Sequence, residues 1–314
     1  MKKILFLYIL FSTPAFASVI NNGSSTLDFS FSNRQYNTAI LSFYNNGLLQ
    51  QSYSLGGGDV YPNLTSYGGG GYPPSSGSVD AKFLPNGDSI VAWAFSGGNS
   101  WATSYFHSYY EIFDNNGLPV GGSTSLTSGM AELYSFGVSI NTSQNGQLAI
   151  NTNGTNIYRN EDGYPKPFIN QTLIGPTFTT INNTMTSNPN LLEISFSDLL
   201  KNSDATDNIG NVNSFIISNI LSGSLLIGSS LENSSAWSSL NNKVIDANHN
   251  AYWIPNTGST GIVNPFSIVA ADNLGLTTGN AIQVSVNVVP IPNAVWLFGS
   301  ALGGLGFVNR RKTT

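Results

Sequence analysis

The chain has 314 residues, no cysteine and 9% charged residues, with 11 Lys and Arg against 16 Asp and Glu. The absence of cysteine excludes a disulfide framework, thiolate metal sites and a cysteine nucleophile. Five of the basic residues lie in the two end segments, so the part of the chain between them has six basic and 16 acidic residues and a formal charge of −10. This negative charge argues against nucleic acid or an anionic lipid surface as a partner.

Residues 1–17 have the pattern of a removable secretory signal. Lys2 and Lys3 precede an apolar run, residues 4–11, and the segment ends in Ala15-Phe16-Ala17, an Ala-x-Ala site for cleavage after Ala17. A buried core helix is the alternative, but it does not explain why charge, apolar run and small residues follow in this order. We therefore expect an exported protein.

Asn-Gly and Asp-Gly turns recur through residues 18–187. Residues 43–49, 112–119 and 157–165 each place a hydrophobic or aromatic pair before polar residues and a glycine, which is typical of tight hairpins. The spacing from Gly117 to Gly163 is 46 residues, and the spacing from Gly87 to Gly146 is 59. Periods of this length indicate blade-like β units.

The best copy of this unit runs from Leu84-Pro85-Asn86-Gly87 through Ile90-Val91-Ala92-Trp93 to residues 112–121. It resembles bacterial propeller-like surface repeats, which implies stacked antiparallel sheets. A closed propeller needs at least about four blades, and two full copies with one partial copy are visible, so we expect an open or incomplete array. The glycine-rich residues 56–77 lack the ending of a phosphate loop and are interpreted as a plain loop.

From residue 188 to residue 289 the pattern changes to short apolar runs separated by turn residues, which is typical of a β-sandwich. The runs are residues 191–196, 215–218, 224–227, 244–246, 251–254, 266–270 and 281–289. Within the last run, residues 282–288 alternate between apolar and polar, so we expect one strand with one buried face.

This second half resembles bacterial cadherin-like and Ig-like surface domains in residues 197–200, 203–207, 252–255 and 266–273. The resemblance implies calcium at aspartate-rich turns. Its candidate ligands are Asp204, Asp207, Asp246 and Asp272, because calcium takes oxygen ligands that include carboxylates. The alternative is that these aspartates only cap turns of the backbone.

The C-terminal segment, residues 290–314, follows a tripartite order. Val289, Pro290, Ile291 and Pro292 precede an apolar run at residues 294–308, which contains Trp296, Leu297, Phe298 and Gly299 and is followed by Arg310 and Arg311. This order resembles a PEP-CTERM sorting signal of the Val-Pro-Leu-Pro-Ala type, with Ile291 where the family has Glu in its plain motif. The resemblance implies recognition by an exosortase-type membrane protease.

The apolar run of 15 residues is expected to form a short transmembrane helix, although a span normally needs about 20. The basic tail would stay in the cytoplasm under the positive-inside rule. An ordinary tail anchor is the alternative to a sorting signal.

No motif indicates catalysis. His107 and His249 have no companion at a metal or triad spacing, and neither a nucleophile elbow nor a His-Glu-x-x-His helix is present. The aromatic run from Trp101 to Phe113 is either a sugar-stacking face or core. The sequence thus predicts an all-β structural or interaction protein of the cell surface or extracellular matrix, not an enzyme, with extracellular polysaccharide as a candidate partner. A calcium- or glycan-binding adhesion module and a secreted hydrolase are the alternatives.

Overall fold

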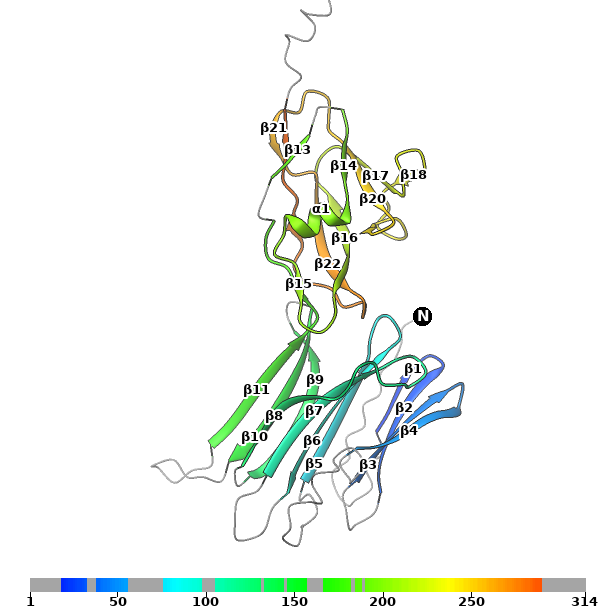
Figure 1. Cartoon of the computed structure of the whole chain (residues 1–314), viewed down its shortest axis with the longest axis vertical. Coiled ribbons are helices and arrows are strands. Elements are labelled where there is room, and N and C mark those ends of the chain that lie inside the picture. The colour runs from blue at the N-terminus through cyan, green and yellow to red at the C-terminus, as the bar shows by residue number, and fades with distance from the viewer. Residues whose placement is uncertain are drawn as a thin grey trace, which may run out of the picture. The chain divides into compact units, whose positions relative to one another are not determined.

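The computed structural model describes residues 18–32, 38–55, 76–97, 105–130, 133–143, 146–156, 166–181, 184–187 and 190–289. The chain divides into two compact units, residues 1–175 with 274–276 and residues 176–273 with 277–314. Both units are built from short, mainly antiparallel sheets, so the expectation of an all-β protein is confirmed (Figure 1).

The first unit contains three successive meanders, in which each strand pairs with its neighbour in sequence (Figure 1). The first sheet has β1 (Ser18–Asn22), β2 (Ser25–Ser32), β3 (Thr38–Asn45) and β4 (Leu48–Leu55). The second sheet has β5 (Ser76–Phe83), β6 (Ser89–Gly97), β7 (Tyr105–Phe113) and β8 (Thr124–Met130). The third sheet has β9 (Leu133–Thr142), β10 (Leu148–Asn156) and β11 (Lys166–Ile174). The described strands form no closed barrel.

The predicted tight turns are present where the structure describes them. Asn46 and Gly47, between β3 and β4, have φ angles of 50° and 77°, the left-handed conformation that two-residue hairpins require. Gly117 has a φ of 80°, and a Cβ on it would lie 2.5 Å from Cγ of Phe43. The turn after β7 therefore needs a glycine both for its backbone and for its close approach to the first sheet. The predicted turn at Gly163 lies outside the described residues.

Apolar side chains join the first and second sheets, and polar side chains join the second and third. The core between the first and second sheets contains Leu27, Phe29, Leu41, Phe43, Leu55, Ala81, Val91, Trp93 and Phe113. The ring centroids of Phe43 and Phe113 are 4.9 Å apart. Between the second and third sheets, the buried hydroxyls of Ser108 on β7 and Thr152 on β10 lie 3.3 Å apart. Side chains of successive sheets thus pack against one another.

The second unit is sandwich-like and contains two four-stranded sheets. One sheet has the order β14 (Leu192–Ile194), β20 (Asn250–Ile254), β17 (Ser224–Gly228) and β18 (Ser234–Ala236). The other has the order β19 (Val244–Asp246), β16 (Val212–Ile220), β22 (Phe266–Asp272) and β23 (Ile282–Gln283). Two smaller sheets consist of β12 (Pro176–Thr177) with β15 (Thr206–Asp207), and of β13 (Met185–Ser187), β24 (Val286–Val288) and β21 (Gly261–Val263).

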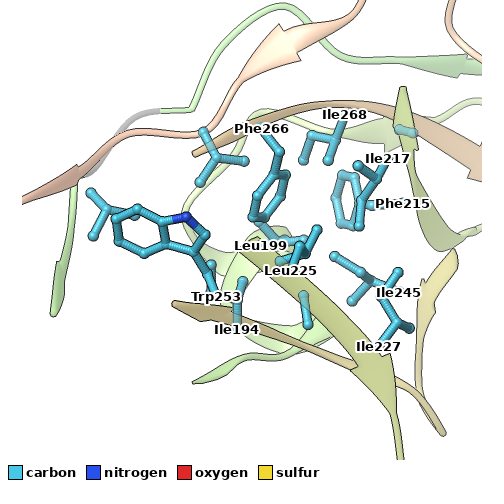
Figure 2. Close-up of a cluster of buried hydrophobic side chains, with 14 of the residues drawn as sticks. Ile194, Leu199, Phe215, Ile217, Leu225, Ile227, Ile245, Trp253, Phe266 and Ile268 are labelled. Atoms are coloured by element: carbon cyan, nitrogen blue, oxygen red, sulfur yellow. The ribbon is translucent and has the colours of Figure 1, made fainter. Parts of the chain in front are cut away.

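The core of this unit draws side chains from both four-stranded sheets. Figure 2 labels Ile194, Leu225, Ile227 and Trp253 from one sheet, Phe215, Ile217, Ile245, Phe266 and Ile268 from the other, and Leu199 from the helix α1 (Phe196–Lys201). The indole N–H of buried Trp253 donates to the carbonyl of Ser222 at 2.8 Å, so its polar atom is satisfied. Ser195 and Asp198 form a capping box at the start of α1.

Two expectations differ from the structure. The division between the units falls at Gly175 and Pro176, whereas the sequence placed it between residues 187 and 188. The reason is that β12 pairs with β15 and Phe178 packs on Phe215, so these residues already belong to the second unit.

The prediction of one strand over residues 282–288 is wrong. β23 pairs with β22, whereas β24 pairs with β13 and β21 in another sheet. The alternation nevertheless continues through the break, because Val284, Val286 and Val288 are all buried. One row of apolar side chains therefore serves two sheets.

Candidate functional site

The outer face of the third sheet carries a set of uncharged polar side chains, which we call the amide face. Successive side chains of a strand point to opposite faces, so the residues that share a face follow from the register. The amide face consists of the polar side chains of Ser139 and Asn141 on β9, Asn151 and Asn153 on β10, and Gln171 on β11, and the apolar Ala149, Ile169 and Leu173 lie on the same side of the sheet. Asn141, Asn153 and Gln171 are exposed, and Ile169 is 73% exposed.

Hydrogen bonds connect side chains within the amide face. The amide of Gln171 donates to Oδ1 of Asn151 at 2.8 Å, and the amide of Asn141 donates to the hydroxyl of Ser139 at 3.3 Å. β9 and β10 contain no charged residue, and β11 contains one, Lys166. Because an amide offers both donors and an acceptor, this face has the chemistry to bind the hydroxyl groups of a neutral partner such as a glycan.

The β9 edge of the third sheet meets the second sheet through a polar seam. Ser78 Oγ accepts from the backbone N–H of Val138 at 3.2 Å and donates to its carbonyl at 3.3 Å. Asp80 Oδ2 accepts from the N–H of Ile140 at 2.6 Å. Side chains of β5 therefore satisfy the outer backbone groups of β9, an edge strand that would otherwise be open to pairing.

Burial acts on the charge of Asp80. Removal from water raises the pKa of this carboxyl above its ordinary value, although the N–H groups of Ile140 and Ala81 and the nearby charge of Lys82 act in the opposite direction. Asp80 is thus a structural acceptor whose ionised form is costly. The seam is a joint between sheets, not a reactive site.

A half-buried strip on β7 holds the first unit's histidine. His107 stacks on Tyr109 with ring centroids 6.2 Å apart, and Tyr109 stacks on Trp93 at 6.0 Å. Burial lowers the pKa of His107 and raises the pKa of Glu111. Burial also raises the pKa of Tyr53, with the negative charges of Glu111 and Asp114 adding to the effect.

The aromatic run that contains this strip serves mainly as core. Tyr110, Ile112 and Phe113 are 7%, 6% and 1% exposed, so their side chains fill space between sheets. His107 and Tyr109 keep partial exposure, while Trp101 lies outside the described residues. The most buried residues of the aromatic run therefore belong to the core, which was one of its two interpretations.

Asp204 stabilises a turn of the second unit. Its Oδ1 accepts from the N–H groups of Thr179 and Thr180, both at 2.9 Å, and its Oδ2 accepts from the hydroxyl of Thr179. Burial acts to raise the pKa of Asp204, but these hydrogen bonds outweigh it and hold the pKa below its ordinary value. The carboxylate is thus engaged by the backbone, as the turn-capping alternative describes.

The other three aspartates lie at separate places. Asp207 accepts from the N–H groups of Ile209 and Gly210, and Asp246 accepts from the N–H of Asn248 and lies 2.9 Å from Nδ1 of His249. Asp272 ends β22 and is 3% exposed. Within the described ranges, no three His, Asp or Glu side chains are grouped to hold a metal ion. Calcium stays a prediction of the resemblance.

The expected processing segments lie almost wholly outside the described residues. Val289 is described and is 45% exposed, whereas Pro290 to Arg311 and the cleavage residues Ala15 and Ala17 are not described. Of the helices in the described ranges, none has the length and apolar character to span a membrane. The apolar run at residues 294–308 is not among them.

The amide face was missed in the sequence, although its signal is present as alternate polar residues in Ser139-x-Asn141 and Asn151-x-Asn153. The Ser78 and Asp80 seam has no local signal, because its partners lie about 60 positions away in the chain. The sequence matches no protein-family model, and no curated protein matches it.

Proposed function

We propose that this protein is exported and acts as a structural or interaction protein of the cell surface or extracellular matrix. The observation that carries the proposal is the C-terminal order of a Pro motif at residues 289–292, an apolar run and Arg310-Arg311, together with the signal-like residues 1–17. An exosortase-type protease would recognise the C-terminal segment, and the apolar helix would hold the chain in the membrane until cleavage. In this proposal the protein is not an enzyme.

The fold supports this role in a general way. Stacked antiparallel sheets give a compact unit whose outer sheet faces are open to solvent, which suits a surface or matrix component. We propose further that the three meanders correspond to blades of an open propeller-type stack and that the second unit is a cadherin-like sandwich. Packing of successive meanders against one another supports the first assignment.

Replacement of Pro290 and Pro292 by alanine tests the sorting step. The double variant should remain in the membrane fraction of the native host with its C-terminal segment uncleaved, because the protease would no longer recognise its motif. Pro119→Ala, at an exposed turn of the first unit, is the control and should be processed normally. Normal processing of the double variant would contradict the proposal.

A second candidate function is glycan binding by the amide face. Its uncharged, exposed amides favour a neutral polysaccharide over an ionic ligand. The double variant Asn141→Ala with Asn153→Ala should lose retention about thirtyfold in affinity electrophoresis through the host's extracellular polysaccharide, since two lost hydrogen bonds of about 1 kcal/mol each remove about 2 kcal/mol. Asn233→Ala, at an exposed asparagine of the second unit, is the control, and equal retention of all three proteins would remove this candidate.

A further inference from the structure

The ladder between β16 and β22 connects the two ends of the second unit. At one end Val212 pairs with Asp272, and at the other end Ile220 pairs with Phe266. Figure 1 shows β15 at the first of these ends and β21 at the second. The two ends lie about 25 Å apart along the strands.

Exposed apolar side chains gather at the end that contains Ile220. Leu221 follows β16, Ile254 ends β20, Ile262 lies on β21 and Val289 follows β24, and we call these four residues the apolar end. Their exposed fractions run from 37% for Ile254 to 72% for Ile262.

The four side chains come from neighbouring segments. The N–H of Leu221 donates to the carbonyl of Pro265, two residues after β21, at 2.8 Å. Ile254 pairs with Ser224, three residues after Leu221. β21 pairs in turn with β24, the strand that Val289 follows. The apolar end is thus assembled by the fold from residues far apart in the sequence.

The two ends of the unit differ in charge. The segments that form the apolar end, residues 219–224, 254–266 and 286–289, contain no charged residue. Asp272 and Asp207, the latter on β15, lie at the opposite end. A separation of about 25 Å exceeds the Debye length of about 8–10 Å at ordinary ionic strength. The apolar end can therefore approach a lipid surface despite the net negative charge of the chain.

The chain that follows Val289 sets how far this end can lie from a membrane. The apolar run expected to form the transmembrane helix begins at Ala294, five residues after Val289. Five residues span at most about 18 Å when fully extended. Insertion of this run therefore holds the apolar end within about 18 Å of the bilayer.

We infer that the apolar end of the second unit docks on the lipid surface while the C-terminal helix is in the membrane. The inference rests on the proposed membrane helix. The exposed apolar side chains enter the boundary between headgroups and acyl chains, which removes their surface from water. Docking also holds residues 290–292 at the membrane surface, where an exosortase-type protease would meet them.

Single cysteines in this cysteine-free chain test the contact. Ile262→Cys, Asn211→Cys and Ser300→Cys are each labelled with a fluorophore in the full-length chain and reconstituted into phosphatidylcholine vesicles that contain a nitroxide lipid as quencher. The label at residue 262 should be quenched at least about twofold more than the label at residue 211, because docked side chains lie about 5–10 Å deep. Residue 211 is exposed at the opposite end of the unit and is the control.

The label at residue 300, within the apolar run, separates the inference from the proposal on which it rests. Quenching at residue 300 without quenching at residue 262 would overturn docking and leave the membrane helix in place. An absence of quenching at residue 300 would overturn both.

A charge at the apolar end distinguishes docking from tethering alone. With the fluorophore on Leu221→Cys, the further substitution Ile262→Asp should reduce quenching at least about twofold, because a carboxylate disfavours entry into the lipid boundary. Ile169→Asp is the matched control, since Ile169 is 73% exposed in the first unit. Unchanged quenching with Ile262→Asp would show that the tether alone brings this end to the bilayer and would overturn docking.

Discussion

At the residue scale, Asp80 shows how a single side chain replaces a neighbouring strand. Its carboxylate oxygens accept hydrogen bonds from the N–H groups of Ile140 and Ala81, and the hydroxyl of Ser78 accepts one from the N–H of Val138. The edge of β9 is thereby satisfied without a further strand. The arrangement costs desolvation of a charge, which is why the pKa of Asp80 rises.

This cost predicts a pH dependence. A carboxyl whose pKa is higher in the folded chain than in the unfolded chain binds a proton more tightly when folded, so its ionisation destabilises the fold as the pH rises. The melting temperature of the wild type should therefore improve relative to Asp80→Asn as the pH falls from about 7 to about 4. Asp88→Asn, compared with the wild type over the same pH range, is the control. A difference in melting temperature between Asp80→Asn and the wild type that does not change with pH would contradict the raised pKa of Asp80.

Residues were predicted unevenly from the sequence. Asp204, Asp207 and Asp246 are candidate calcium ligands in the sequence, with capping of the backbone as the alternative, and each accepts backbone N–H groups. Asp80 was not singled out, because its role depends on a strand about 60 residues away. Local chemistry is visible in sequence, whereas a contact between sheets is not.

At the element scale, hairpins were predictable and strand ends less so. Asn-Gly pairs determine where a strand turns, since few other residues adopt a positive φ. The break between β23 and β24 has no such marker, because the apolar alternation continues through it. Pairing partners, and not the pattern of one strand, decide to which sheet each piece belongs.

Gly117 offers a test of this turn chemistry. Gly117→Ala should lower the free energy of unfolding more than Gly23→Ala does, because both residues have positive φ but only Gly117 contacts Phe43. The left-handed backbone should cost each variant about 1–2 kcal/mol, and the clash should add about 1 kcal/mol or more at Gly117. Urea unfolding midpoints measure both, and equal losses would show that the approach to Phe43 imposes no constraint.

At the scale of the whole molecule, the chain combines two all-β units with end segments that resemble export and sorting signals. The composition predicted the class, since Asn, Ser, Thr, Gly and Tyr favour strands and turns. The division at Gly175 and Pro176 was not predicted, because β12 is only two residues long and its pairing with β15 has no signature in the sequence. The amide face was likewise missed, because the alternate polar residues of β9 and β10 form one face only when the strands pair.

Export followed by C-terminal sorting is the central claim, and the intact mass of the protein from its native host tests it most directly. The surface and medium fractions should contain a chain that lacks Met1 to Ala17 and ends near Pro292. A chain that keeps residues 294–314 in the membrane fraction, with no shorter form elsewhere, would contradict sorting and leave a simple membrane anchor in its place.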